Sequence, residues 1–222
     1  MKAKLISISC FSVLFFSSVY AQDDSDENFY DDIVPKNAFT IELGLPNSTA
    51  NKPYNSMMQG LVKVAPYYQF SLRNHLTFGI GANYTYFKLN RLNINEQING
   101  GIHSVGGFVK VGYEKFHSMR FGTDIGLKLG YGQSIFVSDS NSVNGGPKMV
   151  NAPYVEPTFA VILTANEVSS FRFVVGYAFQ GYGFRPSMLG YNSNAGYDPS
   201  KFSTATQYFT FGFGFTYYIN QY

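Results

Sequence analysis

Large apolar side chains alternate with small or polar residues over most of this chain. In the clearest run, residues 119–131, apolar residues and Thr123 occupy the odd positions, whereas glycines, Arg120, Asp124 and Lys128 occupy the even ones. Successive side chains of a β-strand point to opposite faces, so a period of two predicts strands. Eight such runs follow one another: 39–45, 62–72, 76–86, 104–114, 119–131, 155–164, 171–180 and 209–219.

The two faces of each run differ in a way that is unusual for a soluble protein. One face carries large aliphatic and aromatic residues, and the other carries Gly, Thr and a few charges; only 14% of all residues are charged. A water-facing surface would carry more Lys, Glu and Asp, which disfavours the alternative of a soluble secreted barrel. Small residues fit a narrow barrel interior and large apolar ones fit lipid, so the pattern predicts a transmembrane β-barrel.

Short and long connections alternate between the runs. The short ones are 73–75, 115–118 and 165–170, and the long ones are 46–61, 87–103, 133–153 and 180–206. Outer-membrane barrels have short periplasmic turns and longer extracellular loops. We therefore predict an all-β domain over residues 37–222, a closed eight-stranded antiparallel transmembrane β-barrel. Pro66 and Pro157 lack a backbone donor, so we expect bulges or rim positions there.

The first 36 residues have a different character. Lys2 and Lys4 precede an apolar stretch that ends in Val19-Tyr20-Ala21, which predicts a secretory signal peptide over residues 1–21, cleaved after Ala21. The single cysteine, Cys10, lies inside it. Residues 22–36 hold six of the 14 acidic residues and are predicted to form a solvated acidic periplasmic tail. Export and a barrel together predict the cell outer membrane.

A set of charged residues falls on the predicted inner face. Five are basic and four are acidic: Glu42, Lys63, Lys110, Glu114, Arg120, Asp124, Lys128, Glu156 and Arg172. Unpaired charges inside a barrel would be costly, so we expect a salt-bridge network with a structural role. The functional alternative is a small-solute pore, which the narrow interior of an eight-stranded barrel disfavours.

Few residues offer catalytic chemistry. The histidines are His75 and His117, both in predicted turns, and His103, which lies beside Ser104 near the outer rim. His103 is the only plausible base for a lipid A-modifying hydrolase or acyltransferase. Alternation places His103 and Ser104 on opposite faces, which is poor geometry for a base and its nucleophile. We find no metal-ligand cluster or nucleotide fingerprint, and expect no cofactor and no nucleic-acid partner.

The predicted hairpin over residues 65–84 has a recognisable pattern. It reads Pro-x-x-x-Phe from Pro66, then a short turn containing Asn74, then Leu-x-x-Gly-x-Gly-x-x-Tyr from Leu76. This pattern resembles the small outer-membrane β-barrel domain family common in Bacteroidota. The resemblance implies a barrel related to PorT-like members, which assist a secretion and gliding apparatus, with an architecture similar to the OmpX and OmpA barrels.

These observations favour a non-enzymatic function. We expect an integral outer-membrane protein with a structural or accessory role that presents loops 133–153 and 180–206. The expected partners are outer-membrane lipid, lipopolysaccharide, and an envelope or secretion complex. The alternatives are the lipid A-modifying enzyme and the small-solute pore.

Overall fold

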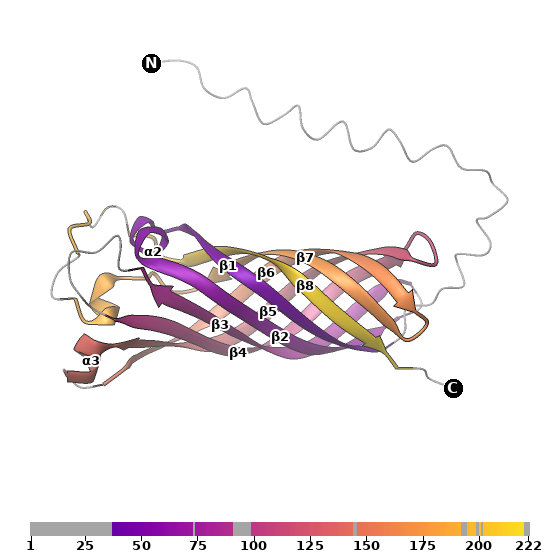
Figure 1. Ribbon diagram of the computed structural model, residues 1–222, viewed down its shortest axis with the longest axis horizontal. Helices are drawn as coiled ribbons and strands as arrows, with labels where there is room; N and C mark the ends of the chain where they lie inside the picture. Colours follow the sequence, from indigo (N-terminus) through magenta and orange to yellow (C-terminus); the bar gives the residue numbers. More distant parts are fainter. Residues whose placement is uncertain are drawn as a thin grey trace, which may run out of the picture. The chain divides into compact units, whose positions relative to one another are not determined.

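The computed structural model describes residues 37–72, 74–90, 99–143, 146–191, 195–198, 200 and 202–219. Eight antiparallel strands pair in sequence order, and β8 pairs with β1 to close a barrel (Figure 1). The predicted fold class is therefore confirmed. The signal peptide and the acidic tail that the sequence predicts lie outside the described residues.

The strands reach further than the alternating runs. Their bounds are β1 Ala38–Ala50, β2 Met58–Ser71, β3 Leu76–Leu89, β4 Gly100–Phe116, β5 Phe121–Ser138, β6 Lys148–Asn166, β7 Ser169–Gln180 and β8 Thr206–Tyr218. Most of the expected loop 133–153 is paired strand, because Gln133 is opposite Asn151 and Phe136 is opposite Lys148. The long loops are thus shorter than predicted.

The two ends of the barrel are built differently. One end, here called the loop end, carries α2 (Lys52–Met57), α3 (Asp139–Val143) and the 3-10 helix η2 (Pro186–Leu189). The other, the turn end, has tight connections such as the β2–β3 turn, where the Leu72 N–H donates to the Leu76 carbonyl at 2.8 Å. None of the helices in the described residues is long and apolar enough to cross a membrane.

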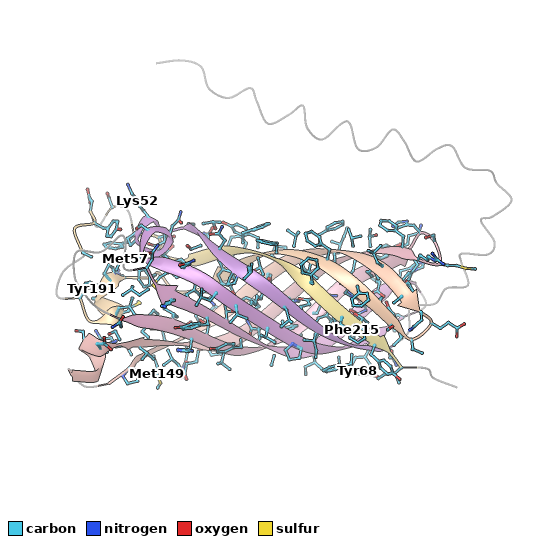
Figure 2. The ribbon with its side chains drawn as sticks, viewed as in Figure 1. Lys52, Met57, Tyr68, Met149, Tyr191 and Phe215 are labelled. Atoms are coloured by element: carbon cyan, nitrogen blue, oxygen red, sulfur yellow. The ribbon has the colours of Figure 1, made fainter. Side chains whose placement is uncertain are left out.

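Side chains alternate between the two faces of the wall, as the sequence predicts. On β8, Phe211, Phe213 and Phe215 are exposed, whereas Thr210 and Thr216 are buried. Side chains cover the outer wall of the barrel along its length, with Tyr68 and Phe215 near the turn end (Figure 2). A closed barrel with an apolar outer wall and a charged interior has the surface of a membrane-spanning barrel.

Pro66 and Pro157 lie within strands at positions without a register shift, so the expectation of bulges or rim positions there was wrong. Pro66 pairs with Ile41, and Pro157 pairs with Leu127. The register shifts fall instead at Ser48/Ala50, Gly60/Val62 and Thr164/Asn166. In an antiparallel ladder each N–H points toward only one neighbouring strand. A missing donor therefore interrupts the ladder on one side and leaves the other intact.

Candidate functional site: a charged interior beneath a closed cap

Two ion pairs join strands on opposite sides of the barrel. Lys63 of β2 pairs with Glu156 of β6, and the Tyr154 hydroxyl also donates to Glu156. Lys128 of β5 pairs with Glu42 of β1. Because these strands lie far apart around the sheet, the pairs cross the interior and tie opposite walls together.

A second group of charges lies toward the turn end. The Arg172 guanidinium contacts Glu114 at 2.5 Å and Asp124 at 2.6 Å, and its Nε donates to the Thr216 hydroxyl at 2.7 Å. Lys110 also pairs with Asp124. Four charges therefore form one connected group, in which Asp124 is shared by two cations.

Arg120 is the one predicted interior charge that the structure places elsewhere. It is exposed in the turn before β5, which begins at Phe121. Its carbonyl accepts a hydrogen bond from the Thr164 N–H at 2.9 Å. The alternating pattern was extended into the turn, where the backbone no longer directs successive side chains to opposite faces.

The paired charges fill the interior. Lys128 and Arg172 are 0% and 1% exposed, and Lys128 Nζ lies 5.3 Å from the centre of the Tyr67 ring. Two interior cavities have volumes of about 20 and about 10 Å³, each with room for about one water molecule. Neither of these two cavities has room for a larger solute.

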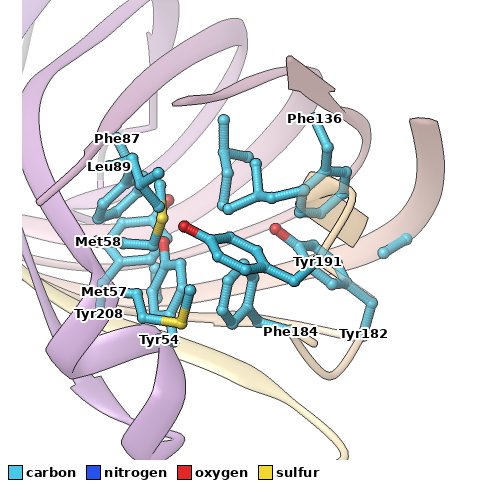
Figure 3. Packing of buried hydrophobic residues seen from close by; sticks show 14 of the residues in the cluster. Tyr54, Met57, Met58, Phe87, Leu89, Phe136, Tyr182, Phe184, Tyr191 and Tyr208 are labelled. Carbon is cyan, nitrogen blue, oxygen red and sulfur yellow. The ribbon is translucent and has the colours of Figure 1, made fainter. Parts of the chain in front are cut away.

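An apolar cluster, here called the cap core, lies at the loop end (Figure 3). Tyr54 of α2 packs against Phe87 of β3 and Phe184 at ring-centre distances of 5.1 and 5.4 Å, and Phe136 packs against Tyr182 at 5.9 Å. The buried members are Tyr54, Met57, Met58, Phe87, Leu89, Ile102, Phe136, Ala152, Tyr154, Ala178, Tyr182, Phe184, Leu189, Tyr191 and Tyr208.

Hydrogen bonds hold the loop segments over this cluster. The segments 51–57, 139–143 and 181–191 are here called the cap. The Asn51 side chain donates to the Phe184 carbonyl at 3.0 Å, which links the first loop to the last. Asn141 donates to the Met188 carbonyl at 2.9 Å and Ser138 donates to the Leu189 carbonyl at 2.7 Å. The last loop is therefore fastened on two sides and closes the barrel.

Sequence reasoning missed the cap. The alternating pattern predicted only a long loop over residues 180–206. The sequence feature that indicates the cap is a set of large apolar residues in this loop. They are Tyr182, Phe184, Leu189 and Tyr191, and all four are buried. A solvated loop has no reason to carry so many large apolar residues. Burial in the cap also raises the pKa of Tyr54 well above its ordinary value.

His103 and Ser104 lie on opposite faces of β4. The Ser104 hydroxyl is buried and bonds the Ser134 hydroxyl at 2.8 Å inside the barrel. His103 faces outward, where its Nδ1 lies 2.9 Å from the Tyr84 hydroxyl. The other two histidines lie at the turn end. There, partial burial and the nearby Lys115 lower the pKa of His117 below its ordinary value of 6.5.

Several solved structures of bacterial proteins are similar to this chain. The chain is similar to Neisserial surface protein A, with a TM-score of 0.53 and 11% identity over 82% of this chain and 97% of that one. The fold is that of the small outer-membrane barrels. OprG from Pseudomonas aeruginosa has a TM-score of 0.49 and 13% identity over 83% of this chain and 97% of that one. Ail of Yersinia pestis has a TM-score of 0.46 and 11% identity over 82% of this chain and 97% of that one. No family model matches the chain, and no curated protein matches it.

Proposed function

We propose that this chain is an integral, non-enzymatic outer-membrane protein whose cap is a preformed recognition surface for an envelope partner. The observation that carries the proposal is the fastening of the last loop to the first and third loops above a filled interior. A surface held in one conformation loses little conformational entropy when a partner binds. The signal peptide predicted over residues 1–21 and the apolar outer wall support the location.

The experiment is affinity purification of the tagged barrel from outer membranes in mild detergent. Lys52 and Arg185 are exposed on the cap and are reversed together, Lys52→Glu with Arg185→Glu. The matched control is Lys115→Glu, an exposed lysine near the turn end. We expect a stoichiometric partner with wild type and the control, and its loss with the cap variant. A barrel that always purifies alone would overturn the proposal.

The alternative of a lipid A-modifying enzyme needs a nucleophile near His103. Ser104 is held on the other face of β4 by Ser134, and the hydroxyl next to His103 belongs to Tyr84. This geometry favours the non-enzymatic proposal. Lipid A from a His103→Ala strain should match that of wild type by mass spectrometry, and an altered acyl pattern would restore the enzyme.

We further propose kinship with the PorT-like barrels of Bacteroidota, with a secretion-complex component as the partner. The support is the hairpin pattern of residues 65–84, which begins within β2 and ends within β3. Identification of the co-purified protein by mass spectrometry tests this finer proposal, and a partner unrelated to secretion would contradict it.

A further inference from the structure

Four outward-facing side chains gather on β3 and β4 near the loop end. Tyr84, Tyr86 and Lys88 come from β3, and His103 comes from β4, directly opposite Tyr86. The imidazole of His103 stacks on the Tyr86 ring, with ring centres 4.6 Å apart and planes at 25°. These four residues are here called the β3–β4 patch. They combine one cation, one imidazole and two phenol hydroxyls on the outer wall.

The patch is held in place by the backbone beneath it. Gly101 of β4 pairs with Lys88, and a Cβ atom at Gly101 would lie 2.7 Å from Cε2 of Tyr86. The absence of a side chain therefore lets the Tyr86 ring lie against β4. The hydrogen bond between the Tyr84 hydroxyl and Nδ1 then fixes the imidazole. The four groups are thus arranged before any ligand arrives.

The patch carries one positive charge, that of Lys88. Lys88 is exposed and forms no ion pair with any residue that the structure describes. The outward Tyr177 on β7 provides a contrast, because its hydroxyl donates to Gln207 at 2.8 Å and accepts from Thr49 at 3.0 Å. That site is neutral and internally satisfied. The β3–β4 patch instead presents a cation to whatever lies against the wall.

Two small outward-facing residues leave open space on the wall beside the patch, further toward the turn end. This open space is here called the hollow. Ala82 of β3 and Gly107 of β4 face outward opposite one another. A Cβ atom at Gly107 would meet no atom closer than 3.8 Å. Tyr131 of β5 pairs with Gly107 and is 62% exposed, so it forms one side of the hollow. The wall next to the polar patch, on the side of the turn end, is therefore apolar and offers open space.

We infer that the β3–β4 patch binds the phosphate-bearing headgroup of an outer-leaflet lipid, with an acyl chain lying along Ala82 and Gly107. This rests on the proposed function, because only in the outer membrane does this wall face a leaflet of phosphorylated glycolipid. Lys88 supplies charge complementarity to the phosphate, and the Tyr86 hydroxyl and the hydrogen-bonded Tyr84–His103 pair each supply one hydrogen-bond donor. The ligand is therefore a lipid A-type phosphoglycolipid.

The experiment uses the full mature barrel in phosphatidylcholine nanodiscs, with the histidine side chains labelled for NMR. Bisphosphorylated lipid A is titrated in, and dephosphorylated lipid A and inorganic phosphate are titrated separately. We expect a saturable shift of the His103 imidazole with bisphosphorylated lipid A alone. His75 and His117 at the opposite end serve as internal references and should not move.

Two variants test the assignment. Lys88→Gln should weaken the apparent affinity about tenfold, the scale expected for a hydrogen bond to a charged group. Gly107→Leu fills the hollow and should also weaken binding of the lipid. Lys115→Gln at the turn end should leave the affinity unchanged. Each variant is first shown to be folded by its heat-modifiable migration on SDS gels.

The outcomes separate this inference from the proposed function. An equal response to dephosphorylated lipid A, or equal affinities for Lys88→Gln and Lys115→Gln, would overturn the phosphate site. A response to inorganic phosphate would show that the patch binds a free anion, which would overturn the lipid as its ligand. In each case the partner purification with the cap variant stands independently, because Lys88 and His103 lie outside the cap.

Discussion

At the scale of single residues, two glycines of the wall differ in the space around them. Gly44 and Gly212 face inward opposite one another, and a Cβ atom at Gly212 would lie 2.1 Å from the Leu43 carbonyl oxygen. Gly107 faces outward, where the nearest atom would be 3.8 Å away. The interior glycine is required by space, and the outward one is not.

Gly212→Ala should therefore destabilise the barrel, and Gly107→Ala should not. The inner methyl group collides with backbone, which cannot rotate away, so we expect a loss of about 1–3 kcal/mol in the free energy of unfolding. The outer substitution should stay within about 0.5 kcal/mol of wild type. Urea unfolding in lipid vesicles measures both, and equal losses would contradict the argument.

The ion pair between Lys63 and Glu156 gives a second prediction at this scale. Lys63→Met leaves a buried carboxylate without its cation, which should cost about 3–5 kcal/mol of folding free energy. The double variant Lys63→Met with Glu156→Leu removes both charges and should be more stable than Lys63→Met alone. Lys115→Met is the exposed control. A double variant less stable than the single one would refute this reading of the pair.

Alternation predicted which charges face inward but not how they pair. Lys63 and Glu156 are 93 positions apart in the chain, and their contact depends on the tilt and stagger of the strands. A period of two specifies which face of the wall a residue occupies, but not its position along the barrel axis. Arg120 was misplaced for a different reason, because the alternating pattern begins at Met119, before the strand starts at Phe121.

At the scale of elements, the centres of all eight strands were predictable and their loop ends were not. The outward positions of β5 and β6 become polar at Gln133 and Asn151, whose side chains bond each other at 3.1 Å. The difference in polarity between outward and inward positions is small there, although the backbone hydrogen bonds of the strand pair continue to Ser138. The cap was missed for a related reason: its contacts join α2, α3 and η2, which are distant in the sequence.

Asn141 should govern the order of the last loop without affecting the barrel. Its buried amide donates to the carbonyls of Phe136 and Met188. Asn141→Ala removes both bonds, so amide hydrogen exchange over residues 186–191 should accelerate by about tenfold, a loss of about 1.4 kcal/mol in local stability. Amide hydrogen exchange over residues 121–132 of β5 should stay at its wild-type rate. The control is Asn151→Ala, and identical exchange in both variants would show that the cap does not depend on Asn141.

At the scale of the whole barrel, two layers close the passage from end to end. The cap core closes the loop end, and the ion pairs fill the interior below it. We expect no single-channel conductance for wild type in planar bilayers. Weakening the cap alone, with Tyr54→Ala and Phe184→Ala, should leave the bilayer silent because the charged layer remains. Conductance steps from correctly folded wild-type protein would support the pore instead.

The ion pairs that cross the interior also set an order of events in biogenesis. Lys63 and Glu156 belong to β2 and β6, and Lys128 and Glu42 belong to β5 and β1, so these pairs form only when the sheet has curled round. A sheet still open in the bilayer would hold these charges, without their partners, against hydrocarbon. Closure must therefore precede or accompany insertion. The charges that fill the closed barrel therefore also make insertion of an open sheet into the membrane unfavourable.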